Sequence, residues 1–165
     1  MPFFINDTLQ GLTDCRIIET VMKMKDSKDV LSSIIKTTQM GQVGIRSVLR
    51  APMSDTLRRA LHSQLKEYDS IETQAHSIAK ARGWELSELN SAVRFMSNAM
   101  SSAKLSFGCN DSKVAAMMVQ GNTRGVIKGL KNEHRYNGSD QQVSQLSKKL
   151  LSCENDNILQ MEQFL

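Results

Sequence analysis

Five polar side chains fall at or near positions that a helical repeat would bury. They are two glutamines, a tyrosine, an asparagine and a glutamate: Gln42, Gln64, Tyr68, Asn122 and Glu154. A buried amide or carboxylate is costly unless it has a hydrogen-bond partner. One interpretation is therefore a core polar layer that fixes the register of the helices, with the Tyr68 hydroxyl bonded to Glu154.

The same part of the sequence allows a second interpretation, an incomplete ligand site. Glu67, Tyr68 and Glu154 could together hold one metal ion or a small polar molecule. A Glu154→Leu variant separates the two interpretations. If that variant is more stable than the parent protein and loses no ligand, the site interpretation fails.

Three glycines recur at four-residue spacing in one predicted helix, at Gly121, Gly125 and Gly129. Each costs roughly 0.5 to 1 kcal/mol relative to alanine in a helix interior, so the stripe needs a structural reason. We expect close packing against the first long helix, where Gly41 and Gly44 are similarly small. The alternatives are a homodimer that crosses on this face and room for a ligand between helices.

A basic line lies on the same predicted helix, with Arg124, Lys128, Lys131 and Arg135 spaced at i, i+4, i+7 and i+11. Such a line could contact an anion or the phosphates of a nucleic acid. No aromatic residues are interleaved with it, and the formal net charge is only +4, from 21 basic and 17 acidic residues. We therefore interpret it first as a solvated helix face, and we expect no nucleic-acid partner.

Methionine supplies much of the apolar content, with ten residues in a chain that is only 5% aromatic. Met96 and Met100 precede Met117 and Met118 on adjacent predicted helices. Flexible thioethers fill irregular gaps, so a core role is expected, and an adaptable binding groove is the alternative. No nucleophile motif, phosphate-binding loop or dinucleotide fingerprint occurs, and we expect no catalytic residues.

The cysteines and the first residues bear on the cellular compartment. Cys15, Cys109 and Cys153 are odd in number and widely spaced, which favours reduced thiols over a disulfide framework or a zinc signature. The sequence shows no secretory signal and no window near the roughly 18 apolar residues of a membrane span. We expect a cytoplasmic protein without a membrane partner.

The elements that position these residues are predicted to be helices. Only Pro2 and Pro52 are prolines, and the hydrophobic period of three to four residues indicates an all-α chain. The predicted helices cover 27–49, 54–82, 87–107, 113–133 and 139–165. Residues 1–26 are expected to form an N-terminal arm or short extra helix, and residues 27–165 an up-and-down antiparallel four-helix bundle.

The helix over 54–82 has the clearest signals. Ser54 is a predicted cap and Gly83 a predicted C-terminal glycine. Its inward stripe repeats every 3.5 residues on average: Leu57, Leu61, Gln64, Tyr68, Ile71, Ala75 and Ile78. Asp111 or Ser112 is expected to cap the helix over 113–133. The stripe of the last helix is Val143, Leu146, Leu150, Glu154, Ile158, Met161 and Leu165.

Three runs of sequence resemble motifs of a poorly characterised bacterial ferritin-like family. They are SKVAAMMVQGNTRGVI at 112–127, QLKEYDSI at 64–71 and ENDNI at 154–158. The resemblance covers about residues 28–165. It implies a small four-helix bundle of ferritin-like topology, and it implies no firm activity.

A ferritin-like bundle raises the possibility of a di-iron centre, which needs a glutamate from each of two helices and a Glu-x-x-His pair from each of the others. This sequence has no Glu-x-x-His, and its nearest approach is Glu72 with His76. We therefore expect no cofactor. The leading functional hypothesis is a non-catalytic bundle that acts through protein interaction or as a homodimer or higher homo-oligomer. The alternative is an iron-handling protein with a non-standard, incomplete carboxylate site.

Overall fold

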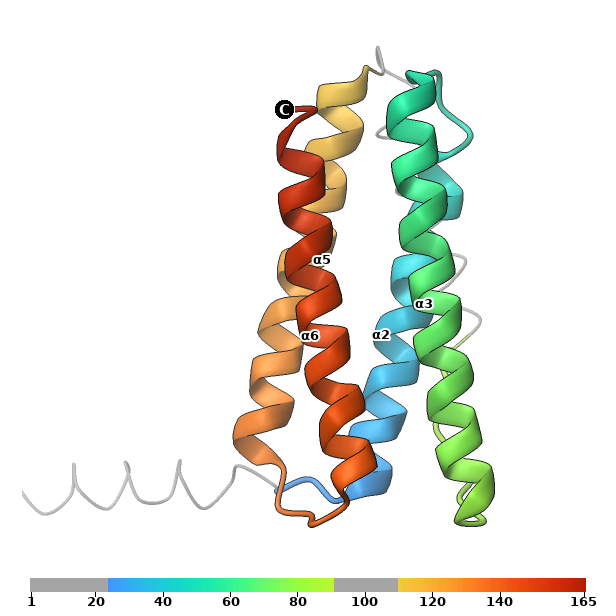
Figure 1. Cartoon of the computed structure of the whole chain (residues 1–165), viewed down its shortest axis with the longest axis vertical. Coiled ribbons are helices and arrows are strands. Elements are labelled where there is room, and N and C mark those ends of the chain that lie inside the picture. Colours follow the sequence, from blue (N-terminus) through green and yellow to red (C-terminus); the bar gives the residue numbers. More distant parts are fainter. Residues whose placement is uncertain (1–23, 91–109) are drawn as a thin grey trace, which may run out of the picture.

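The computed structural model describes residues 24–90 and 110–165 as a bundle of long helices that lie side by side (Figure 1). The helices are α2 (Ser27–Val48), α3 (Asp55–Ala81), α5 (Asp111–Arg135) and α6 (Gln141–Glu162). The predicted all-α four-helix bundle is confirmed. None of these helices combines the length and the apolar content needed to cross a membrane.

The ends of the helices follow local capping chemistry. The Ser54 side chain accepts a hydrogen bond from the Leu57 N–H at 3.2 Å, and Gly83 takes a φ of 65° just beyond α3, so both predicted signals are confirmed. The cap of α5 is Asn110, whose side chain accepts from the Lys113 N–H at 2.9 Å. The prediction of Asp111 or Ser112 was wrong by one residue, because Asp111 already lies in the first helical turn.

The helix predicted over 87–107 does not begin at its expected residue. Residues 84–90 are not helical, and two of their N–H groups bond to side chains of α2. The Ser87 N–H donates to Ser32 Oγ at 3.1 Å, and the Leu89 N–H donates to Gln39 Oε1 at 2.9 Å. The remainder of that prediction, and the arm up to residue 23, lie outside the described residues.

Contacts at the two ends of the bundle define the directions of its helices. The Ser54 N–H donates to Asp111 Oδ1 at 2.9 Å, which joins the start of α3 to the start of α5. At the other end, Arg82 lies 2.6 Å from Asp140, which joins the end of α3 to the start of α6. The pairs α2–α3 and α5–α6 are therefore antiparallel, whereas α3 and α5 run the same way (Figure 1). The end of α3 and the start of α5 therefore lie at opposite ends of the bundle.

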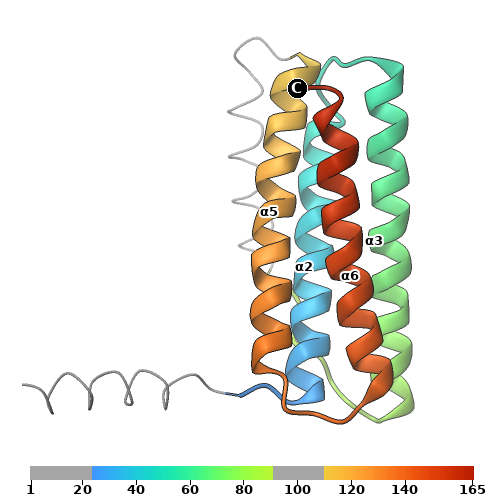
Figure 2. The same cartoon turned by 60° about the vertical axis from the view of Figure 1, so that its left-hand side comes forward.

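The packing pattern places α5 beside α2 and α6, and α3 beside the same two helices (Figure 2). The predicted stripe of α3 is buried through Ala75, but the last turn buries Ala79 in place of Ile78. A helix has 3.6 residues per turn, so a strict 3.5-residue pattern drifts off the buried face over its length. In α6 the stripe is buried at Val143, Leu146, Leu150, Glu154 and Met161, but Asn157 is buried in place of Ile158. Leu165 lies beyond the helix end and is exposed.

Candidate binding site

Three helices bring together the buried side chains Tyr68, Asn122 and Glu154. The Tyr68 hydroxyl oxygen lies 2.9 Å from Glu154 Oε2 and 3.0 Å from Asn122 Oδ1. Each of the three residues is at most 2% exposed. The expected bond between Tyr68 and Glu154 is confirmed, and it connects α3 to α6 in the centre of the bundle.

The single hydrogen of the Tyr68 hydroxyl cannot serve both acceptors. Both contacts become hydrogen bonds when Glu154 is protonated and donates to the tyrosine oxygen, which frees the hydroxyl for Asn122. They are also satisfied if the Asn122 amide is turned so that its nitrogen donates to Tyr68. Among the described residues, the Asn122 Nδ2 atom has no hydrogen-bond partner as placed. In the first of these two arrangements, the Asn122 amide nitrogen is a buried donor without a partner among the described residues.

Burial controls the protonation of this cluster. It raises the pKa of the Glu154 carboxyl to about 7, and the hydrogen bond from Tyr68 opposes that rise. Burial also raises the pKa of Tyr68 well above its ordinary value, with a further rise from the neighbouring Glu154. Near neutral pH the phenol is protonated and the carboxyl is divided between its two forms.

Glycines make the space that Tyr68 and Glu154 occupy. A Cβ atom on Gly41 would lie 2.6 Å from the Tyr68 ring, and one on Gly125 would collide with the Glu154 carboxyl. A Cβ on Gly129 would lie 3.2 Å from Leu151. The close packing expected of the glycine stripe therefore exists at Gly125 and Gly129. Its partner is α6, and the prediction that the stripe packs on α2 was wrong.

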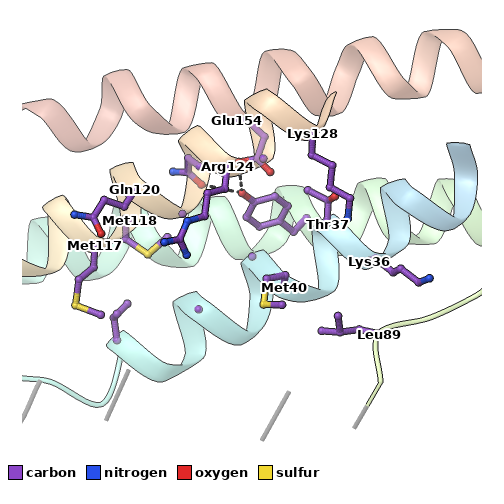
Figure 3. A pocket seen from close by; sticks show the side chains of 17 residues that line it. Lys36, Thr37, Met40, Leu89, Met117, Met118, Gln120, Arg124, Lys128 and Glu154 are labelled. Carbon is purple, nitrogen blue, oxygen red and sulfur yellow. Dashed lines mark hydrogen bonds between the residues drawn. The ribbon is translucent and has the colours of Figure 1, made fainter. Parts of the chain in front are cut away.

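A cavity of about 400 Å³ lies between α2 and α5, with its inner wall formed by the Tyr68 cluster (Figure 3). Gly44 of α2 and Gly121 of α5 line it, and no atom of residues 24–90 or 110–165 lies within 4 Å of the place where a Cβ of either would stand. Most of the remaining wall is apolar: Met40, Val48, Leu89, Met117 and Met118. Of the methionines singled out in the sequence, Met96 and Met100 lie outside the described residues.

Three cations also line the cavity: Lys36 from α2, and Arg124 and Lys128 from α5. Figure 3 shows Arg124 and Lys128 extending from α5 toward α2. Burial lowers the pKa of Lys128, and the like charges of Lys25 and Lys36 lower it further. Glu154 is the single acidic residue among the described residues that line the cavity.

The predicted basic line is therefore divided by the fold. Arg124 and Lys128 face the cavity, whereas Lys131 and Arg135 are not part of its lining. Sequence periodicity gave no signal for Lys36, because it lies on another helix and contributes to the site only through packing of α2 on α5.

The other two residues of the predicted core polar layer are buried but lie in separate groups. Gln42 donates to Glu72 Oε2 at 2.6 Å between α2 and α3. Gln64 donates to Gln160 Oε1 at 2.8 Å between α3 and α6. The layer is thus three local hydrogen-bonded groups, each joining a different set of helices.

Glu67, the third residue of the predicted ligand site, does not join Tyr68 and Glu154. Its side chain accepts a hydrogen bond from the Cys153 thiol at 3.4 Å, outside the cavity lining. Burial and the nearby Glu67 raise the pKa of Cys153 to about 12, so this sulfur is a thiol at neutral pH. Within residues 24–90 and 110–165 no three or more His, Cys, Asp or Glu side chains are grouped as metal ligands.

Glu72 and His76, the pair nearest to a ferritin ligand motif, lie elsewhere in the bundle. The His76 Nε2 atom is 3.7 Å from Glu72 and 3.8 Å from Glu88. Glu72 also receives hydrogen bonds from Gln39 and Gln42, at 2.8 and 2.6 Å. These contacts hold together α2, α3 and the segment after α3, and they account for both members of the pair. The cavity between α2 and α5 is therefore the strongest candidate site.

The chain matches no protein-family model, no curated protein and no solved structure. The resemblance to the bacterial ferritin-like family rests on the sequence motifs.

Proposed function

We propose that this protein is a non-catalytic binding protein, a ferritin-like helical bundle that holds a small, mainly apolar molecule in the cavity between α2 and α5. The observation that carries the proposal is the space beside Gly44 and Gly121, which no residue in the described part of the chain fills. The ferritin-like assignment is supported by two antiparallel helix pairs in which the end of α3 and the start of α5 lie at opposite ends of the bundle, because such a crossover connection is found in that fold.

Gly44 and Gly121 lower the stability of their helices, so the space beside them needs a structural or functional reason. A glycine in a helix interior lowers stability by about 0.5 to 1 kcal/mol relative to alanine. Gly41 and Gly125 offset that cost by admitting Tyr68 and Glu154, but Gly44 and Gly121 admit no side chain of the described residues. The cavity they leave lies within the size range of small-molecule sites and has the usual composition of an apolar wall with a few polar groups.

The test is calorimetric titration of the full chain with a neutral apolar probe, 1-octanol. We expect saturable binding that Gly121→Leu weakens tenfold or more, because the new side chain occupies the cavity. Leucine is also a better helix former than glycine, so this variant should fold. The matched control is Thr123→Leu, which adds the same side chain at an exposed position of α5 outside the lining.

Equal binding by both leucine variants would place the probe elsewhere and overturn the proposal, as would an absence of binding to the parent protein. One further variant tests whether side chains of this chain, rather than a ligand, fill the cavity. If replacing Met96, Met100 and Phe107 by serine creates binding that the intact chain lacks, the cavity is filled by the chain itself and the proposal fails.

The sequence-based expectation of a homo-oligomer has separate support on α5. Ile127 and Leu130 are 48% and 43% exposed there, although large aliphatic side chains favour burial. We propose that this face mediates self-association. Analytical ultracentrifugation should show an oligomer that Ile127→Lys with Leu130→Lys dissociates, and a monomeric parent protein would contradict it.

A further inference from the structure

The cavity is lined by more positive than negative side chains, and binding an apolar molecule does not need these charges. Lys36, Arg124 and Lys128 line it, and within the described part of the chain none of them is in an ion pair. Lys128 is partly buried, so its ammonium group has lost part of its hydration without gaining a carboxylate in return. An arrangement of this kind attracts an anion.

The acidic residue of the lining does not neutralise these cations. Glu154 is directed to Tyr68, with 2.9 Å between its Oε2 atom and the tyrosine oxygen. Burial keeps this carboxyl partly protonated near neutral pH because its pKa is about 7. Positive charge therefore exceeds negative charge around the cavity.

The lining of the cavity combines apolar side chains with cations. Met40, Met117 and Met118 supply flexible apolar surface that adapts to an irregular hydrocarbon. Arg124 and Lys128 are one helical turn apart on α5, so their charged groups can converge on one acidic group. A ligand that satisfies both parts has an apolar body and one anionic end.

We propose that the natural ligand is an organic carboxylate with an apolar body, with its carboxylate at Arg124 and Lys128 beside Lys36 and its apolar part along Gly44, Gly121 and the methionines. This inference rests on the proposed binding function and specifies the ligand class. A nucleic acid fits less well, because Lys131 and Arg135 of the basic line do not line the cavity and its walls are mainly apolar.

The experiment compares three probes with the same eight-carbon chain: octanoate, 1-octanol and octylammonium. Calorimetric titration of the full chain at low salt should give the tightest binding for octanoate, about tenfold or more over the alcohol, because a hydrogen bond to a charged group adds affinity. Lys128→Met should reduce octanoate to the affinity of the alcohol. The matched control Lys131→Met removes one positive charge from the same helix outside the lining and should keep the preference.

The outcomes distinguish a failure of the carboxylate inference alone from a failure of the proposed binding function. If octanol binds as tightly as octanoate, the carboxylate inference fails and the apolar binding function stands. If no probe binds, both fail. If a single-stranded oligonucleotide displaces octanoate and Lys131→Met weakens binding as much as Lys128→Met, the basic line is a nucleic-acid surface and the carboxylate inference is overturned.

Discussion

The carboxyl group of Glu154 lies directly against the Cα atom of Gly125, where any larger residue would collide with it. Glu154 belongs to α6 and Gly125 to α5, so this contact sets how closely the two helices approach at the level of the cavity. The same carboxyl also accepts a hydrogen bond from the Tyr68 hydroxyl. A buried acid is thus enclosed by a glycine that makes room for it and a phenol that bonds to it.

Alanine substitutions at two glycines of α5 should have opposite effects on stability. Gly125→Ala places a methyl group on the Glu154 carboxyl and should destabilise the protein by about 1 to 3 kcal/mol, as overpacking does. Gly121→Ala meets no atom of the residues that the structure describes and should stabilise the protein by roughly 0.5 to 1 kcal/mol through helix propensity. Urea unfolding measures both, and effects of the same sign would contradict this account.

Stability should depend on pH through Glu154. Its pKa is about 7 in the folded protein against 4.5 for the ordinary carboxyl, so the folded state binds the proton more tightly. The resulting stabilisation is fully present below pH 4.5 and is lost as the pH rises toward 7. The loss is about 3 kcal/mol, because each pKa unit corresponds to about 1.4 kcal/mol.

The measurement for this pH effect is urea unfolding at intervals from pH 5 to pH 8. Glu154→Gln is the matched variant, because the amide is close to the protonated acid in shape and can donate to Tyr68 but does not titrate. The variant should lack the part of the pH dependence that belongs to Glu154. Parallel curves for the two proteins would show that this carboxyl titrates normally.

Metal addition should leave the protein unchanged. Glu67 bonds to the Cys153 thiol and is separate from Tyr68 and Glu154, and a metal would have to displace the proton that Glu154 retains. We expect no stoichiometric metal in protein purified without chelator, and no rise in melting temperature with Fe²⁺ or Zn²⁺. A rise that Glu154→Gln abolishes would support the iron-handling alternative instead.

The four described helices were predictable from the sequence because their signals are local. Ser54 and Gly83 bound α3 as expected, and the stripe from Leu57 to Ala75 marks its buried face. Caps, helical periodicity and the absence of proline act within a few residues of each other along the chain. Errors appear where the signal is short or drifts, as at Asn110 and Ala79.

The contacts between the helices and their relative directions could be learned only from the tertiary structure. The buried positions of Gln42, Gln64 and Glu154 were predictable from periodicity, but their partners were not, since each hydrogen bond joins residues from different helices. The direction of α5 relative to α3, and the position of Lys36 near Lys128, were likewise not predictable from periodicity. Periodicity specifies which face of a helix is buried, whereas the neighbour on that face depends on the packing of the whole bundle.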